Sequence, residues 1–133
     1  MGVEPSRAHP TDAGLDLYAQ ENALLHNGVS VLIDTATRVS IPDGYVGLLF
    51  GRSGLGAKHG VSPVNAVGVI DSGYTDSIKV ALTKHTNGAY RVELGERIAQ
   101  LVIVPIAIPT LKRVRAFDLT ERGENGFGSS GEK

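Results

Sequence analysis

The segment Arg52-Ser53-Gly54 places a guanidinium, a hydroxyl and a residue without a side chain at one point of the chain. It follows the apolar run Tyr45–Phe50 and opens a short helical pattern that ends at Gly60. The first N–H groups of a helix lack partners within the helix, so together with an arginine they can bind an anion such as phosphate. The segment also fits an ordinary helix start, in which Ser53 caps the helix and Arg52 lies on the surface.

A second candidate is Asp71, which directly follows the apolar stretch Val67–Ile70. Asp71 opens the turn Asp71-Ser72-Gly73-Tyr74, so a carboxylate and an exposed tyrosine are expected close together. A carboxylate at the end of a strand can act as a general base and take a proton from water. Aspartate is also a common turn-forming residue, and that role needs no chemistry.

Other patterns do not lead to a site. Gly126, Gly128 and Gly131 match the spacing of the dinucleotide-binding fingerprint, which works only between a strand and a helix. The histidines are too scattered to predict a metal cluster; they are His9, His26, His59 and His85. The sequence contains no cysteine, which excludes a disulfide, a cysteine zinc site and a thiol nucleophile and fits a reducing compartment.

Short strands must position these groups, because several apolar stretches alternate with polar residues at a period of two, as in Ile78–Leu82. Pro42-Asp43-Gly44 and Asn87-Gly88 are typical turns between such stretches. The expected strands are Leu24–Ile33, Thr37–Ile41, Tyr45–Phe50, Val67–Ile70, Ile78–Leu82, Tyr90–Leu94 and Ile98–Val104. One helix is expected at Ser53–His59, where Ser53 would cap the first turn. The sequence therefore predicts an all-β, jelly-roll-like β-barrel or sandwich with one short helix.

The size of the chain fits one domain followed by a flexible tail. Its 133 residues are 41% hydrophobic and 20% charged, which suffices for a single core. From Arg122 to Gly131 the sequence has four glycines and one aromatic residue, so it cannot offset the entropy of its own ordering. We therefore expect a β-barrel domain over residues 1–121 and a flexible, glycine-rich C-terminal arm over residues 122–133.

The net charge and the hydropathy of the sequence limit the kinds of partner that we expect the protein to bind. The net charge of -1 argues against nonspecific binding to nucleic acid. The longest apolar stretch, Leu101–Ile108, is too short to cross a membrane and contains Pro105. No signal-peptide pattern begins the sequence, so we expect a cytoplasmic protein that is not secreted, or one in the host cytosol or nucleus if it is viral.

Five segments, taken in order, resemble the signature motifs of the trimeric dUTPases, the deoxyuridine triphosphate nucleotidohydrolases. They are Ala13-Gly14-Leu15-Asp16-Leu17, Pro42 through Gly54, Gly68 through Ile78, Gly95-Glu96-Arg97-Ile98-Ala99-Gln100-Leu101, and Arg122 through Gly131. The resemblance spans nearly the whole chain, and five ordered motifs are far more specific than any one of them. It implies hydrolysis of dUTP to dUMP and pyrophosphate, with Mg²⁺ as cofactor, in a homotrimer whose active sites are shared between subunits. This reaction keeps uracil out of DNA and supplies dUMP for dTMP synthesis.

The same resemblance implies a role for each matching residue. Asp71 would be the general base for attack of water on the α-phosphorus, and Asp16 would hold Mg²⁺ through water. Tyr74 would pack under the deoxyribose and leave no room for a 2′-hydroxyl. The residues expected to line the phosphate chain are Arg52, Ser53, Gly54 and Gln100.

The resemblance also implies how the base and the triphosphate are enclosed. Uracil would be read by Asn65 together with the backbone of Val69, Ile70 and Lys79. In the arm, Phe127 would stack on the base. The arm residues expected to close over the γ-phosphate are Arg122, Gly128, Ser129 and Ser130.

The sequence departs from the family at two points. Thr75-Asp76 stands where many members carry Arg-Gly, and Gly51 stands where proline often precedes the Arg-Ser pair. Asp76 adds a negative charge near the hairpin, where it could change substrate affinity and subunit contacts.

Two alternatives remain beside dUTP hydrolysis. The dCTP deaminases resemble dUTPases in fold, but they place a catalytic glutamate on the strand after the hairpin, and Ile78–Leu82 contains no acid. The second alternative is a noncatalytic protein that uses the same scaffold to regulate or bind a partner.

Overall fold

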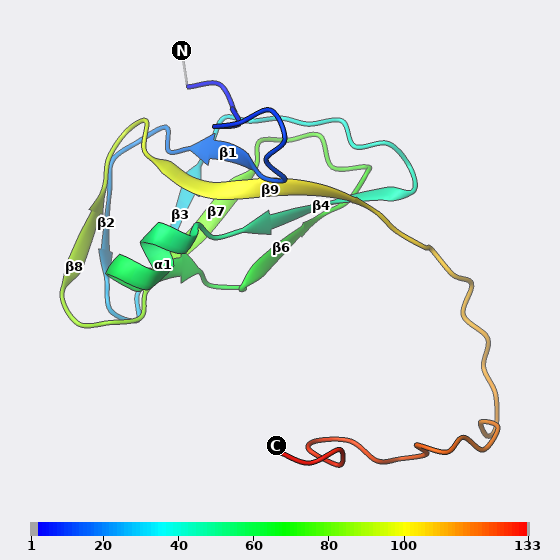
Figure 1. The fold of residues 1–133 in the computed structure, drawn as a ribbon. Coiled ribbons are helices and arrows are strands. Elements are labelled where there is room, and N and C mark those ends of the chain that lie inside the picture. Colours follow the sequence, from blue (N-terminus) through cyan, green and yellow to red (C-terminus); the bar gives the residue numbers. More distant parts are fainter. Residues whose placement is uncertain (1–2, 133) are drawn as a thin grey trace.

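Strands make up almost all of the regular structure (Figure 1). The computed structural model describes residues 3–132, so Met1, Gly2 and Lys133, which belong to the expected domain and arm, lie outside the described residues. Within residues 3–132 the elements are β1 (Leu15–Tyr18), β2 (Ala23–His26), β3 (Val31–Asp34), β4 (Tyr45–Phe50), α1 (Ser53–His59), β5 (Val61–Pro63), β6 (Val67–Ile70), β7 (Lys79–Lys84), β8 (Ala89–Val92) and β9 (Arg97–Pro105). The expected all-β fold with one short helix is confirmed.

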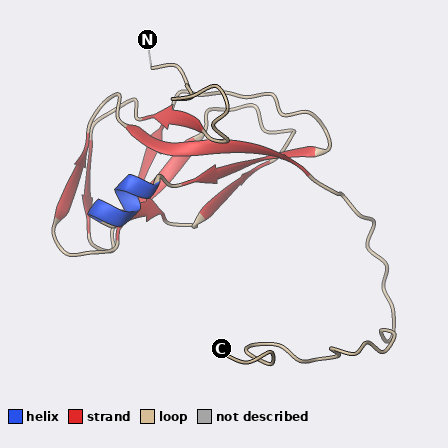
Figure 2. Cartoon of the chain, in the orientation of Figure 1, coloured by secondary structure: helices blue, strands red, loops and turns tan. Residues whose placement is uncertain are grey.

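The strands form three sheets, with the helix beside them (Figure 2). The largest sheet has the order β1-β9-β4-β6, and each neighbouring pair is antiparallel. Its central pair aligns Tyr45 with Pro105 and Phe50 with Gln100. The other sheets are β2-β8 and β3-β7-β5. Over the described part of the chain these sheets do not close into a barrel, so the fold is the open, jelly-roll-like form of the expected architecture.

Apolar residues that alternate along the strands meet in one core. On β7, for example, Val80 and Leu82 are buried whereas Lys79 is exposed. The largest side chains that are fully buried are Leu17, Leu25, Ile33, Val61, Ile78, Val80, Leu82, Val92, Ile98 and Leu101. Burial of one such side chain stabilises the fold by about 1.5–3 kcal/mol, so this core holds in place the strands that carry the site.

The expected strand Leu24–Ile33 is wrong in detail, because it is two strands, β2 and β3. Gly28 has a φ of 75°, a left-handed conformation that glycine adopts without strain and that a strand cannot continue through. The Gly28 N–H donates to the carbonyl of Lys84 at 3.1 Å. The chain therefore turns against the end of β7 before β3 begins.

The expected strand Thr37–Ile41 is also wrong, since these residues form no strand. Ala36, just before them, has a φ of 51°, which interrupts any extension of β3. The carbonyl of Thr37 accepts a hydrogen bond from the N–H of Ile78 at 2.8 Å. The segment therefore bonds to the end of a hairpin instead of joining a regular ladder.

β1 and β5 were not expected as strands. They have four and three residues, too few for a period of two to be evident. β5 includes Pro63, which is tolerated because β5 is an edge strand of its sheet. β4 and β6 have the expected bounds, whereas the bounds of β7, β8 and β9 differ from the expected ones by one or two residues.

The helix α1 has the expected bounds but a different start. Its N-cap is Arg52, which has extended backbone and makes no side-chain capping bond, so the expected Ser53 cap is wrong. Gly60 ends the helix as expected, with a φ of 63° and an N–H that donates to the Gly56 carbonyl at 3.0 Å. No helix within residues 3–132 is long and apolar enough to cross a membrane.

After β9 the chain leaves the body as one long segment that curves below it (Figure 1). The described residues of this segment, 106–132, contain no helix or strand. Its aromatic side chains project into solvent, with Phe117 exposed to 90% and Phe127 to 112% of their reference areas. In the single chain this segment therefore contributes nothing to the core.

Candidate active site

A pocket of about 440 Å³, which we call the hairpin pocket, lies beside β6 and the hairpin that follows it. Its wall contains the expected general base and all of the residues expected to bind the base and sugar except Phe127 of the arm: Asn65, Val69, Ile70, Asp71, Tyr74 and Lys79. The rest of the wall is mainly apolar, including Leu49 and Pro63. The structure thus brings six of the expected site residues together in one cavity.

The backbone of β6 is accessible because this strand lies at the edge of its sheet. β6 pairs with β4 on one side, and no strand within residues 3–132 pairs with its other side, where backbone N–H and C=O groups can meet a ligand. One β6 amide, the Val67 N–H, already donates to the Asn65 carbonyl at 2.6 Å. The side chain of Val69 is strongly exposed here. Gly68 keeps the two strands close, since a Cβ at this position would lie 3.1 Å from the Cβ of Leu49.

Asp71 and Tyr74 occupy the two ends of the tight turn after β6. The turn is closed by the Tyr74 N–H, which donates to the Asp71 carbonyl at 3.0 Å. The Asp71 carboxylate is exposed and accepts no hydrogen bond from any of residues 3–132, so it is available to a water molecule. The Tyr74 hydroxyl donates to the Ser77 carbonyl at 2.8 Å, and 40% of this residue is exposed.

A second cavity of about 350 Å³ contains Asp16, Arg52, Ser53 and Gln100, and we call it the phosphate pocket after the residues expected to bind phosphate. Asp16 and Gln100 face each other across the β1–β9 pair. The Gln100 amide donates from Nε2 to the Gly51 carbonyl at 3.0 Å, which fixes its side chain at the pocket wall. Gly54, the remaining residue expected to bind phosphate, lies on the first turn of α1 in an adjoining hollow.

In the phosphate pocket the Asp16 carboxylate lies between two guanidiniums, and a second carboxylate, that of Asp12, also lines the wall. Arg52 donates from Nε to Asp16 Oδ1 at 3.2 Å, and Arg97 donates from Nη1 to Asp16 Oδ2 at 3.4 Å. The Asp16 side chain is only 13% exposed, whereas those of Arg52 and Arg97 are 30% and 45% exposed. The triad itself carries one net positive charge, which the second carboxylate of the pocket, Asp12, balances. What suits an anion is therefore the guanidinium donors of Arg52 and Arg97 that reach solvent.

Arg97 is the residue of this pocket that the sequence interpretation missed. It belongs to the Gly95–Leu101 segment, but no role was expected for it. Its pairing with Asp16 depends on an irregularity between Leu17 and Tyr18, after which Tyr18 lies opposite Arg97. Such a bulge redirects side chains and is not evident in the residue pattern.

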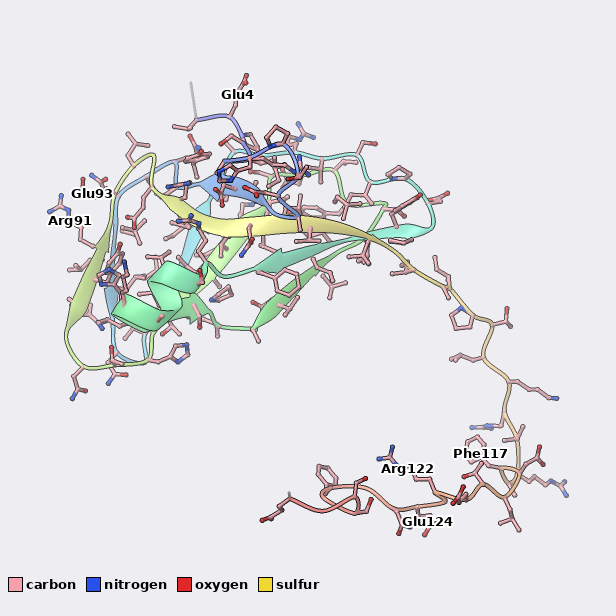
Figure 3. The ribbon with its side chains drawn as sticks, viewed as in Figure 1. Glu4, Arg91, Glu93, Phe117, Arg122 and Glu124 are labelled. Atoms are coloured by element: carbon pink, nitrogen blue, oxygen red, sulfur yellow. The ribbon has the colours of Figure 1, made fainter. Side chains whose placement is uncertain are left out.

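The arm residues form a third, separate group. Arg122, Ser129 and Ser130 line a shallow hollow within the arm itself, and Arg122 donates from Nε to the Asn125 carbonyl at 2.9 Å. Figure 3 shows Arg122 on the arm, apart from the body that carries both pockets. Phe127 and Gly128 both have positive φ, 32° and 82°, in this same coiled stretch. Within one chain, the structure does not bring the arm residues to either pocket.

Known proteins are similar to the chain over most of its length. The family model for dUTPase matches residues 2–131. The chain is 45% identical to the deoxyuridine 5'-triphosphate nucleotidohydrolase of Cutibacterium acnes, over 96% of this chain and 84% of that protein. It is also 45% identical to the protein of the same name from Pseudomonas fluorescens, over 96% of this chain and 86% of that protein.

Solved structures of phage proteins are similar to the chain over most of its length. A mutant dUTPase of Staphylococcus bacteriophage 80alpha with dUpNHpp has a TM-score of 0.91 and 39% identity, over 98% of this chain and 92% of that one. A mutant dUTPase of phage phi11, whose structure concerns the coordination of a structural Mg(II) ion, has a TM-score of 0.81 and 33% identity, over 89% and 93% of the two chains. The chain is thus a member of the dUTPase family of enzymes.

Proposed function

We propose that the protein hydrolyses dUTP to dUMP and pyrophosphate. The observation that carries this proposal is the hairpin pocket, where the exposed Asp71 carboxylate lies beside a free strand edge and the Tyr74 ring. The names of the bacterial relatives and the dUpNHpp bound in a similar phage structure support the same substrate.

In this proposal Asp71 acts as the general base. A water molecule bound to its carboxylate loses a proton to it while attacking the α-phosphorus, and the bond from that phosphorus to the bridging oxygen of the leaving pyrophosphate breaks. A positioned carboxylate contributes about 10²- to 10⁴-fold to such a step. Because its side chain has no partner among residues 3–132, little reorganisation is needed before it binds the water.

The edge of β6 and the Asn65 side chain bind uracil. Backbone N–H and C=O groups of Val69, Ile70 and Lys79 match the donor and acceptor pattern of uracil, and cytosine would leave buried groups unpaired. The close approach of this backbone leaves no space for the 5-methyl group of thymine. Tyr74 lies under the sugar and excludes ribose by contact with its 2′-position.

The phosphate pocket binds the triphosphate through Arg52, Ser53, Gly54 and Gln100. Within residues 3–132 no group of three His, Cys, Asp or Glu side chains forms a metal cage. Mg²⁺ usually keeps several waters and binds one or two carboxylates together with phosphates. Two carboxylates, Asp12 and Asp16, line this pocket, and Asp16 fits that mode through water. When bound, Mg²⁺ would neutralise charge on the phosphates and so improve the leaving group.

The active site is completed in a homotrimer. In one chain the hairpin pocket, the phosphate pocket and the arm are lined by different residues, which suits a site assembled from several subunits. The arm of another subunit would place Phe127 on the base and close Arg122, Gly128, Ser129 and Ser130 over the γ-phosphate. In a cytoplasmic setting the reaction would keep uracil out of DNA and supply dUMP for dTMP synthesis.

A pyrophosphate-release assay with dUTP, dCTP, dTTP and UTP tests the proposal. With Mg²⁺ present we expect turnover of dUTP to dominate, and Asp71→Asn to lower kcat by about 10²- to 10⁴-fold. Asp43→Asn is the matched control, since Asp43 is an exposed turn residue outside both pockets and its change should leave kcat unaltered. Equal turnover of all four nucleotides, or none with Mg²⁺ supplied, contradicts the proposal.

A further inference from the structure

Residues 34–38 run from the last residue of β3 into the segment that was expected to be a strand at 37–41. We call residues 34–38 the brace, because they hydrogen-bond to the returning half of the hairpin. Thr35, which is buried, donates from Oγ1 to the Ile78 carbonyl at 2.7 Å, and Arg38 donates from Nε to the Thr75 carbonyl at 2.7 Å. The brace therefore holds both ends of the stretch Thr75–Ile78, which directly follows Tyr74.

Ser77 lies at the centre of that stretch and connects the brace to the Tyr74 ring. Its hydroxyl donates to Oδ1 of Asp34, and its carbonyl accepts the Tyr74 hydroxyl at 2.8 Å. Asp34 Oδ1 also accepts the N–H of Ala36 at 2.8 Å, which fixes the carboxylate relative to the brace backbone. A continuous chain of hydrogen bonds thus runs from Asp34 through Ser77 to the phenol of Tyr74.

Asp34 is suited to a permanent structural role in this chain of bonds. The Ser77 hydroxyl and then the Ala36 N–H, with a smaller contribution from Lys79, hold the pKa of the Asp34 carboxyl below its ordinary value. The group is therefore ionised throughout the neutral range and remains a strong acceptor. Asp34 lines neither pocket, so it acts on a ligand only through other residues.

We propose that Asp34 and Ser77 are positioning residues that set the preference of this site for deoxyribose over ribose by fixing the Tyr74 ring. The inference rests on the proposed function, because it concerns how the same site excludes a 2′-hydroxyl. A ring whose hydroxyl is anchored to a braced carbonyl cannot move aside to admit the extra oxygen. When the brace is broken the ring gains freedom, and the uridine ribonucleotide fits better.

The test compares kcat/KM for UTP and dUTP in variants that keep the pocket wall intact. Ser77→Ala removes the link to Asp34 and leaves the carbonyl in place, and Asp34→Ala removes the acceptor. We expect each to raise the UTP-to-dUTP ratio of kcat/KM by about fivefold, the equivalent of one net hydrogen bond. Asp34→Asn keeps an acceptor oxygen and should retain most of the discrimination. Ser40→Ala is the control, because Ser40 is exposed just beyond the brace and lines neither pocket.

A double-mutant comparison separates the effect of the brace on the UTP-to-dUTP ratio of kcat/KM from a general effect on folding. If Asp34 acts through the Tyr74 hydroxyl, Asp34→Ala should add nothing to the ratio in a Tyr74→Phe background. A change that only loosens the fold lowers turnover of both substrates together and leaves the ratio unaltered, which would overturn the inference. Multiplicative effects in the double variant would overturn it as well.

Failure of the inference and failure of the proposed function give different results. Wild-type protein that does not hydrolyse dUTP contradicts the function itself. Wild-type protein that does hydrolyse it, with the same UTP-to-dUTP ratio in wild type, Ser77→Ala and Asp34→Ala, contradicts only the role of the brace.

Discussion

Mixing two inactive variants tests whether one active site is built from more than one chain. One variant is Asp71→Asn with a complete arm, and the other ends after Glu121 and so lacks Arg122 and Phe127. The two changes affect regions that share no lining residue, the hairpin pocket and the arm. Each variant alone should form trimers that have lost most of their activity.

The expected recovery follows from random assembly. If the hairpin and the arm of one site come from different subunits, an equimolar, co-refolded mixture gives each site an intact hairpin with probability of about one half and, independently, an intact arm with probability of about one half. About one quarter of the sites are then complete, so the mixture should show about one quarter of wild-type activity. If both parts came from the same chain, every site would lack one of them.

Steady-state pyrophosphate release before and after co-refolding measures the recovery, and light scattering checks that trimers form. Two control mixtures calibrate it, since wild type with either variant should retain about one half of the activity. A mixture that stays at the residual level of the separate variants, although trimers have formed and the controls give the expected half, would refute shared sites. Full activity of the truncated chain alone would refute the role of the arm.

Two further predictions follow from single side chains. A Cβ on Gly14 would clash with Gln100 Oε1 and lie 3.2 Å from Gln100 Cβ. Gly14→Ala should therefore displace the Gln100 side-chain amide from the Gly51 carbonyl. We expect KM for dUTP to rise about tenfold, the value of one charge-assisted hydrogen bond. Steady-state kinetics measures this, and an unchanged KM contradicts it. Burial and then the hydrogen bond to Glu96 raise the pKa of Tyr90 to about 12. This folded-state pKa lies above the unfolded value, so protonated Tyr90 stabilises the folded protein fully below about pH 10. That contribution to the free energy of unfolding is lost as the pH approaches 12. Urea unfolding between pH 10 and 12 should show a smaller loss in the free energy of unfolding for Tyr90→Phe than for wild type. Identical pH profiles of the two proteins would argue against this role of Tyr90.

The parts of the fold that the sequence predicted are those fixed by local residues. β4 has the expected bounds because Pro42-Asp43-Gly44 precedes its apolar run, and α1 ends where Gly60 can adopt a positive φ. The strand expected at Thr37–Ile41 failed because bonds to residues distant in sequence, such as the one from Ile78 to Thr37, replaced a regular ladder. Such competition depends on tertiary structure and is not evident in a period of two.

In the candidate site too, residues close together in the sequence were easier to predict than residues that the fold brings together. Five of the six expected residues of the hairpin pocket lie between Asn65 and Tyr74, so a single hairpin brings them together with little help from the rest of the fold. The pairing of Asp16 with Arg52 and Arg97 joins three elements, β1, the start of α1 and β9, and needs the shift in β1–β9 register between Leu17 and Tyr18 to form. For that reason the sequence predicted that Asp16 and Arg52 belong to one site but missed the second arginine of the pocket.

At the departure from the family, Thr75-Asp76, the Asp76 side chain makes local polar contacts within the hairpin. Asp76 was expected to add a negative charge that could change substrate affinity and subunit contacts. In the structure its Oδ1 accepts the Ser77 N–H at 2.7 Å and its Oδ2 lies 3.9 Å from the Lys79 Nζ. The Asp76 and Lys79 side chains are 71% and 41% exposed, and a pair in such contact with solvent contributes little energy in either direction. Its main effect is local, because it caps the backbone of the residue whose carbonyl holds the Tyr74 hydroxyl. The hairpin of this chain is therefore ordered by short polar bonds from Asp76 and the brace, and its sugar preference should depend on those bonds.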